Sequence, residues 1–430
     1  MTELVFPPDF LWGAATSGHQ VEGGNEHADW WDWEREPGTP VREPSGNAVE
    51  HYTRYASDLS LLASLGLNAY RFSVEWSRVE PEEGDFDLEA IAHYRDMVRK
   101  ARARHLTPIV TLNHFTLPRW TALGGGWTSP RTPVLFERYA RRVVAELGDG
   151  VDWYCTINEP TTVATGGYVG RWGFPPGVVD VPRWKKAIAG LVEGHKRARA
   201  AVKETRPEAR AGLAAFAVER VTNAGGRAAN EYWQRWNEDV YLDAAAEDDF
   251  IGVQAYTREV LNLPRIVSPL TRLALAIKPL ENTVVPRVLA MHDPLRGERA
   301  FRVTQMGWEY RPESIAAAVR RVAARYPDKD LLVTEHGVGT LDDNHRIELI
   351  ARGLAALHDA MADGVRLRGY LHWSLLDNFE WARGYSANFG LIEVDRATQK
   401  RLVRPSARFL GQIARTGRLD AEAIPLGGGC

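Results

Sequence analysis

Short apolar runs alternate with longer segments of helical periodicity along most of the chain. The strand-like runs are residues 10–16, 68–74, 107–113, 152–158, 210–218, 249–256, 330–335 and 368–375. Helical patterns lie between them, including residues 88–105, 134–147, 184–205, 230–246, 313–325 and 345–362. Eight apolar strands, each followed by a helix, are typical of a parallel sheet covered on both faces. The pattern predicts an α/β fold with one catalytic domain, a (β/α)8 or TIM barrel over residues 1–430.

One segment interrupts this alternation. Residues 258–302 follow the sixth predicted strand, and much of their sequence is apolar. Loops of such length are uncommon in compact domains unless they have a function. We therefore interpret residues 258–302 as a long loop that forms a lid or rim over a site. An oligomer contact and a membrane contact are the alternatives.

Composition and charge restrict the class of partner. Hydrophobic residues make up 44% of the 430 residues and charged residues 25%, as in globular proteins. The formal net charge of -3, without dense runs of Lys and Arg, excludes a nucleic-acid-binding field.

The cysteines and the first residues indicate the compartment. Cys155 lies in a strand-like run and Cys430 is the last residue, so we expect no disulfide and a reducing environment. The opening sequence MTELVFPPDF lacks the basic and apolar regions of a signal peptide, and no uninterrupted run of 18 apolar residues follows. We expect a cytoplasmic protein without membrane contact.

Carboxylates stand where two predicted strands end. The fourth strand ends in Asn158 and Glu159, and the seventh, LLVTEHG, ends in Glu335. In a (β/α)8 barrel these ends surround the catalytic mouth, so two glutamates from distant strands can converge there. Such a pair suits glycoside hydrolysis, in which one carboxyl group donates a proton and the other stabilises positive charge on the sugar. Structural ion pairs with arginines are the alternative.

The tryptophans and histidines bear on whether the chain binds a sugar or a metal. The chain has 15 tryptophans, many beside Gly, Pro or Glu, which fits either a sugar platform or ordinary packing. The 12 histidines show no HExxH or similar ligand spacing. We therefore expect no metal and no cofactor.

Several long motifs resemble glycoside hydrolase family 1, the retaining β-glycosidases with a (β/α)8 barrel. The resemblance covers about Phe6 to Phe409. It is carried by FLWGAATSGHQVEG, RFSVEWSR, TLNHFTLPRW, TINEP, VTEHG and HWSLLDNFEWARGYSANFGL. The resemblance implies an exo-β-glycosidase that removes terminal non-reducing β-D-glycosyl residues through a covalent glycosyl-enzyme intermediate.

The matching motifs also imply roles for individual residues. Glu159 would be the acid/base and Glu335 the nucleophile, flanked by Arg71 and Tyr256, which keep it ionised. Asn158 would bind the sugar 2-OH. The remaining positions would form the substrate pocket: Gln20, His114, Trp373, Glu380, Trp381 and Phe389 around the sugar, and Trp172 and Trp308 at the aglycone entrance.

Several of these residues could instead have a purely structural role. Arg71 could neutralise any acid of the barrel, and His114 could be a core histidine. Trp373, Trp172 and Trp308 could be packing residues. Three positions depart from the family pattern, namely His336, Gln254 and Asn388. Because side chains alternate along a strand, His336 should point away from Glu335, and we interpret it as a packing residue.

The resemblance narrows the substrate. The branch of the family that acts on 6-phosphorylated sugars lacks the carboxylate at position 380, so Glu380 favours neutral sugars. We expect a β-glucosidase that also accepts β-galactosides or β-fucosides, with small-molecule β-glycosides as its partners. A transglycosylating enzyme and a non-catalytic sugar-binding barrel are the alternatives, and a homo-oligomer is left open.

Overall fold

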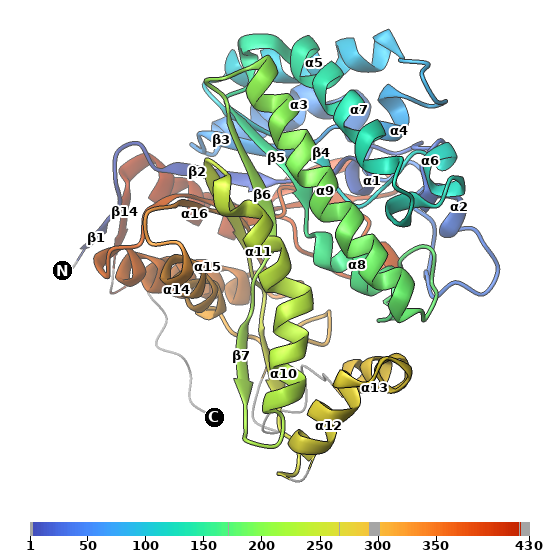
Figure 1. The fold of residues 1–430 in the computed structure, drawn as a ribbon. Coiled ribbons are helices and arrows are strands. Elements are labelled where there is room, and N and C mark those ends of the chain that lie inside the picture. The colour runs from blue at the N-terminus through green and yellow to red at the C-terminus, as the bar shows by residue number, and fades with distance from the viewer. Residues whose placement is uncertain (1–2, 171, 266, 292–301, 421, 423–430) are drawn as a thin grey trace.

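The computed structural model describes residues 3–170, 172–265, 267–291, 302–420 and 422 (Figure 1). Eight parallel strands form a closed barrel, in which each is hydrogen-bonded to the next along the chain and the last to the first. They are β2 (Leu11–Ala15), β3 (Ala69–Ser73), β4 (Thr107–Asn113), β5 (Trp153–Asn158), β6 (Arg210–Phe216), β8 (Phe250–Gln254), β10 (Asp330–His336) and β11 (Leu367–Trp373). The predicted (β/α)8 barrel is confirmed, and predicted and observed strand ends differ by two residues at most.

The barrel interior is packed by one side chain from each strand. A buried cluster joins Ala69, Ile109, Cys155, Ala214, Phe250, Leu332 and Leu371, with Leu11 packed against it. Because successive side chains of a strand point to opposite faces, the alternate residues face the outer helices. The apolar runs in the sequence therefore reflect strands that are buried on both faces.

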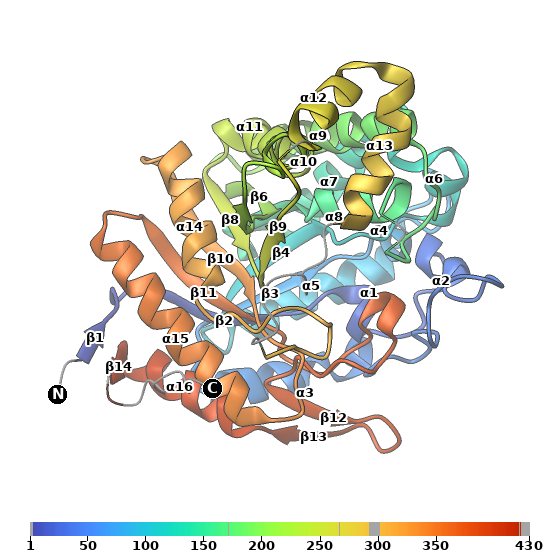
Figure 2. The ribbon, with the colours of Figure 1, turned by 90° about the horizontal axis from the view of Figure 1, so that it is seen from below.

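Helices surround the barrel (Figures 1 and 2). They include α3 (His51–Ser64), α5 (Leu88–Arg102), α7 (Thr132–Leu147), α9 (Val181–Thr205), α10 (Arg227–Gln234), α14 (Ser314–Arg325), α15 (Asp343–Ala362) and α16 (Pro405–Thr416). Local sequence starts several of them. Asp87 caps α5 by accepting from the N–H groups of Glu89 and Ala90, and Asp180 caps α9 through the N–H of Arg183.

Short elements complete the ends of the barrel. The short helices are α1 (Gly18–Val21), α2 (Asp29–Trp33), α4 (Trp76–Val79), α6 (Arg119–Leu123), α8 (Pro160–Tyr168) and α11 (Val240–Ala244). Three two-stranded sheets pair β1 (Glu3–Val5) with β14 (Arg418–Asp420), β7 (Glu219–Thr222) with β9 (Arg258–Leu261), and β12 (Ile392–Asp395) with β13 (Lys400–Val403). None of the described helices has the length and apolar character needed to cross a membrane.

The segment after the sixth barrel strand, which we interpreted as a long loop, contains regular secondary structure. It contains β9, α12 (Val267–Ala276) and α13 (Lys278–Met291), and residues 292–301 lie outside the described part of the chain. The buried carboxylate of Glu281 anchors α13 by accepting from Lys185 Nζ at 2.6 Å and from the Tyr232 hydroxyl at 2.7 Å. These partners are remote in sequence, so the local pattern did not reveal the helices.

Close contact between α9 and the turn at Trp127 provides a test of packing. A Cβ atom added at Gly190 would lie 2.0 Å from the carbonyl oxygen of Trp127. Although Gly→Ala ordinarily favours a helix by about 1 kcal/mol, we expect Gly190→Ala to lower the free energy of unfolding by about 1–3 kcal/mol, because backbone must move. Urea unfolding should show this loss, and the exposed Lys186→Ala in the same helix should change stability by less than about 0.5 kcal/mol. Equal effects of the two substitutions would contradict the prediction.

Candidate active site

A cavity of about 570 Å³ opens where the barrel strands end. Residues that end or follow six different strands line its inner part: Gln20, His114, Glu159, Tyr256, Glu335 and Trp373. Eleven of the thirteen residues predicted from the sequence line the cavity. The other two, Arg71 and Asn158, are fully buried and contact the lining residues from behind.

Glu335 lies near the end of β10 and is held by two donors. Arg71 Nη1, from β3, donates to Glu335 Oε1 at 2.6 Å. The Tyr256 hydroxyl donates to Oε2 at 2.5 Å. The pKa of Glu335 is raised, because burial outweighs the Arg71 guanidinium and the Tyr256 hydroxyl, which act in the opposite direction. Both oxygens of this carboxyl group accept hydrogen bonds that favour its ionised form.

Asn158 connects the donors around Glu335 with His114. Its Oδ1 accepts from Arg71 Nη2 at 2.5 Å and from Gln254 Nε2 at 2.8 Å. Its Nδ2 lies 3.1 Å from His114 Nε2. Burial holds the pKa of His114 well below its ordinary value, so the ring is neutral and its Nε2 accepts. Gln254, which departs from the family pattern, therefore donates to Asn158 through a longer side chain.

Glu159 has a different environment. It lies between β5 and α8, and its only hydrogen-bond donor from a side chain among the described residues is Thr162 Oγ1, which is 2.7 Å from Oε2. Burial, together with the negative charge of Glu335, raises the pKa of Glu159 to about 8. At neutral pH Glu159 is therefore mostly protonated and can donate a proton.

Three residues of the cavity wall have a strained backbone. Glu159, Phe115 and Trp381 have φ angles of 35°, 74° and 49°, in the left-handed region that disfavours residues with a Cβ atom. All three line the cavity. Strain of this kind persists where the surrounding structure fixes the backbone, and it is common at functional sites.

Another part of the cavity lining carries polar and aromatic groups. Gln20 Nε2 donates to the Phe379 carbonyl at 2.8 Å and lies 3.4 Å from Glu380 Oε2. Burial and the charge of Glu335 raise the pKa of Glu380 to about 8. The rings of His114 and Trp373 stack with their centroids 5.7 Å apart. This part of the cavity offers both hydrogen-bonding groups and flat apolar faces, the combination that sugars require.

Trp381 is supported from behind by other rings. It stacks on His19, with the centroids 5.7 Å apart and the planes 6° apart. Trp30 lies 4.5 Å away, and Phe174 and Phe115 complete the cluster. Because its neighbours pack on several sides, the indole has little freedom to move.

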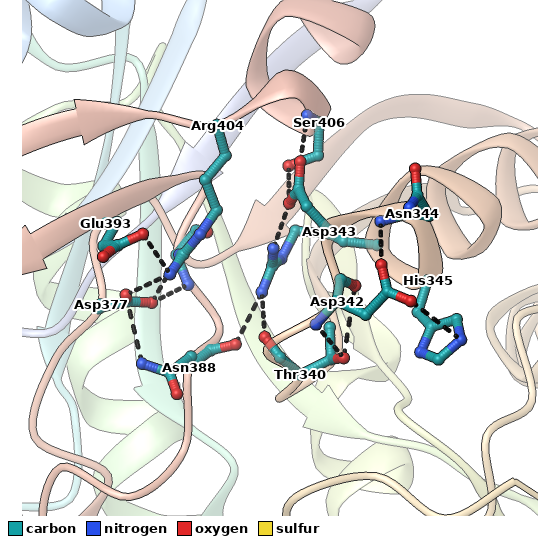
Figure 3. Close-up of polar contacts among 12 residues, drawn as sticks. Thr340, Asp342, Asp343, Asn344, His345, Asp377, Asn388, Glu393, Arg404 and Ser406 are labelled. Carbon is teal, nitrogen blue, oxygen red and sulfur yellow. Dashed lines mark hydrogen bonds and ion pairs between the residues drawn. The ribbon is translucent and has the colours of Figure 1, made fainter.

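Polar contacts hold the backbone on either side of Phe389, and Figure 3 shows the part of this network around Arg404, Asp377 and Asn388. Arg346 Nη2 donates to the carbonyl of Asn388 at 2.8 Å. Arg404 Nη1 donates to the carbonyl of Gly390 at 2.7 Å, and both guanidinium nitrogens bind Asp377 at 2.8–2.9 Å. Asn388 itself does not line the cavity. The departure of Asn388 from the family pattern therefore affects the polar network beside Phe389 and not the cavity lining.

His336 lies outside the cavity. It is fully buried, and its Nδ1 is 3.1 Å from the hydroxyl of Tyr370. Burial lowers its pKa to about 3, so the imidazole is neutral. The neighbouring Glu335 faces the cavity, in agreement with the alternation of side chains along a strand.

The outer part of the cavity is mainly aromatic. Trp172 is 45% exposed, and Trp308 lies 5.7 Å from the ring of Tyr256. Trp233, Phe216 and Met306 extend this apolar surface. The strand β9 contributes Glu259 and Val260 to the lining, so residues 258–302 border the cavity through their first few residues.

Sequence reasoning missed several lining residues. Phe115 and Thr162 stand one and three positions after His114 and Glu159, so proximity to the motifs could have revealed them. Arg383 stands two positions after Trp381 in the same way. Met306 and Glu259 have no such signal, because tertiary folding brings their segments to the barrel mouth. No cluster of metal-binding side chains occurs in the described part of the chain.

A (β/α)8 barrel with two glutamates at the ends of its strands defines the class of glycoside hydrolases. Comparison with known sequences specifies the family. The sequence model of glycosyl hydrolase family 1 matches residues 2–245 and 237–418. The chain belongs to glycosyl hydrolase family 1, a family of retaining exo-β-glycosidases, and is a glycoside hydrolase of the β-glucosidase type.

Individual relatives agree with this assignment. The chain is 30% identical to β-glucosidase A of Thermotoga maritima, over 98% of this chain and 100% of that protein. It is 32% identical to a bifunctional β-D-glucosidase/β-D-fucosidase of Bifidobacterium breve, over 94% and 96%. Among solved structures, a β-glycosidase from Pyrococcus horikoshii superposes with a TM-score of 0.86 at 34% identity, covering 98% of each chain.

The contacts around Phe389 predict that Asp377 supports the pocket. We expect Asp377→Asn to lower the free energy of unfolding by about 3 kcal/mol, because it leaves the charge of Arg404 without its close partner. It should also raise the KM for an aryl β-glucoside, because Phe389 loses a support. Urea unfolding and steady-state kinetics measure both effects.

The same arginine offers a matched control for this substitution. The side chain of Glu393 is 51% exposed and lies 3.5 Å from Arg404 Nη2. Glu393→Gln should change stability by less than about 1 kcal/mol and leave KM unaltered. Equal losses in the two variants would show that Asp377 has no special supporting role.

Proposed function

We propose that this chain is a β-glucosidase that also accepts β-galactosides and β-fucosides, with Glu335 as nucleophile and Glu159 as acid/base. The observation that carries the proposal is the unequal environment of the two carboxyl groups. Glu335 is held by a guanidinium and a phenol hydroxyl. Glu159 lacks a cationic partner among the described residues, and its pKa is about 8. Pairs of carboxyl groups with separated pKa values are suited to acid and nucleophile roles.

In the first half-reaction the carboxylate of Glu335 attacks the anomeric carbon. The bond from this carbon to the leaving oxygen breaks, and the proton of Glu159 moves to that oxygen. In the second half-reaction Glu159, now a carboxylate, takes a proton from water. The resulting hydroxide oxygen bonds to the anomeric carbon and Glu335 is released, so the product keeps the β configuration. Transglycosylation differs only in that another hydroxyl replaces water.

The polar wall supports a neutral sugar. Gln20 and Glu380 are close together and would bind hydroxyl groups, with Trp373 and Trp381 against the sugar faces. A phosphate next to Glu380 would be repelled whenever that carboxyl group is ionised. Asn158 has a second amide hydrogen that would bind the 2-OH. Glucose, galactose and fucose share most of these contacts, and one of the relatives described above is named for two of these sugars.

Two further expectations remain predictions. The free thiol of Cys155 is buried in the barrel interior, which supports a reducing, cytoplasmic location. Light scattering would measure whether the protein forms a homo-oligomer.

The substrate assignment predicts a definite order of rates and a definite product. We expect 4-nitrophenyl β-D-glucoside, β-D-galactoside and β-D-fucoside to be hydrolysed, and the β-mannoside poorly, because its 2-OH points away from Asn158. NMR during turnover should show the β-anomer of the free sugar first. Initial release of the α-anomer would refute the double displacement, and product analysis at high acceptor concentration would detect transglycosylation.

The two carboxyl groups predict the pH dependence of kcat/KM. Activity should fall at alkaline pH as Glu159 loses its proton with a pKa near 8, and at acidic pH as Glu335 gains one. Glu159→Gln should abolish the alkaline limb and lose about 10²–10⁴-fold with a poor leaving group. It should form the glycosyl-enzyme readily from 2,4-dinitrophenyl β-glucoside, which needs no protonation.

The isosteric variant at the other glutamate is the matched comparison. Glu335→Gln should lose turnover with both substrates, because no leaving group can replace the missing nucleophile. If Glu159→Gln and Glu335→Gln lost activity equally with both substrates, the assigned roles would be wrong.

A further inference from the structure

The charged residues of the cavity are few, and one of them is a cation. The lining contains four carboxyl groups and the guanidinium of Arg383. The carboxyl groups belong to Glu159, Glu259, Glu335 and Glu380. Arg383 is therefore the only arginine or lysine in the described lining, and whether it can bind an anionic ligand depends on which of these carboxyl groups it already pairs with.

Each carboxyl group is already compensated or mostly uncharged. Glu335 pairs with Arg71 at 2.6 Å, and Glu259 pairs with the buried Arg220 at 3.3 Å. Glu159 and Glu380 have pKa values of about 8, so both are largely protonated at neutral pH. None of the four needs Arg383 as its counter-ion.

Arg383 has no ion pair among the described residues. Its Nη2 donates to the carbonyl oxygen of Met306 at 3.1 Å, and the side chain is half-buried. This contact leaves most of the five guanidinium N–H groups without a protein acceptor in the described structure. A partly buried cation of this kind favours an anion from outside the chain.

The position of Arg383 places that anion on the leaving-group side. Arg383 ends the short turn Trp381–Arg383 that follows β11, and its guanidinium contacts the segment that carries Met306 and Trp308. The neighbouring Ala382 lies against Gly173, next to Trp172. Arg383 thus borders the aromatic outer cavity.

We propose that the outer cavity selects β-glycosides whose aglycone is an aromatic ring bearing a carboxylate, with Arg383 binding the carboxylate. This inference rests on the β-glycosidase function proposed above and adds the class of leaving group. The rings of Trp172 and Trp308 would pack on the aromatic face, and the guanidinium would form paired hydrogen bonds to the two carboxylate oxygens.

Matched substrates test the inference. We would measure kcat/KM for 4-carboxyphenyl and 4-carbamoylphenyl β-D-glucoside, two aglycones of similar shape that differ in charge. We expect Arg383→Gln to lower the ratio of the two values by about tenfold, equivalent to ~1.4 kcal/mol. The effect should fall mainly on KM, because the contact exists before the bond breaks. Because each ratio compares the same two substrates, differences in leaving-group acidity cancel between variants.

Two variants and one solution condition serve as controls. Arg42 is an exposed arginine whose Nη1 binds Ser386 Oγ at 3.1 Å beside the same loop, but it does not line the cavity. Arg42→Gln should keep the wild-type ratio, whereas Arg383→Lys should retain part of it. In the wild type, added KCl should lower the ratio, because salt screens a partly exposed ion pair.

The outcomes separate this inference from the function on which it rests. If the wild type hydrolyses 4-nitrophenyl β-glucoside but Arg383→Gln leaves the ratio unchanged, the inference is overturned and the β-glycosidase function stands. An equal fall of the ratio in Arg42→Gln would also overturn it, because surface charge alone would then explain the preference. If the wild type hydrolyses no aryl β-glycoside, the proposed function fails and the inference fails with it.

Discussion

The active site depends on one guanidinium that is removed from water. Arg71 is fully buried in the barrel, where an unpaired charge would cost several kcal/mol. Its terminal nitrogens donate to Glu335 from β10 and to Asn158 from β5, which lie on opposite sides of its own strand in the barrel order. Three strands are therefore held in a fixed relation by one side chain. The charge that keeps Glu335 ionised also fixes its position.

The difference between the two glutamates follows from this arrangement. Both are buried, and burial alone raises the pKa of each. Arg71 and Tyr256 stabilise the charge of Glu335, and that charge then disfavours ionisation of Glu159. The proposed division of roles between these two identical residue types therefore rests on one electrostatic field. Neither pKa is a property of the local sequence TINEP or VTEHG.

A second polar layer supports the part of the pocket that carries no catalytic charge. Arg346, Arg404 and Asp377 hold the backbone next to Phe389 and connect the loop after β11 with the ends of α15 and α16 (Figure 3). Gln305 adds a bond to the N–H of Asn388 at 2.8 Å, which joins the segment that bears Trp308 to the same loop. Hydrogen bonds thus connect the inner polar part of the cavity with its outer aromatic part.

The sequence by itself determined the barrel and the identity of the residues at its mouth. Apolar runs of strand length predict buried strands, and in a parallel barrel their last residues must converge, which located Glu159 and Glu335 before any contact was known. Segments whose helices depend on distant anchors, such as Glu281 with Lys185, were misread as loop. Only the tertiary structure decided which carboxyl group keeps its proton, how Asn158 is held, and that Arg383 borders the cavity without a counter-ion. These properties arise from burial and from charges that lie far apart in the chain, and periodicity and motifs contain no information about either.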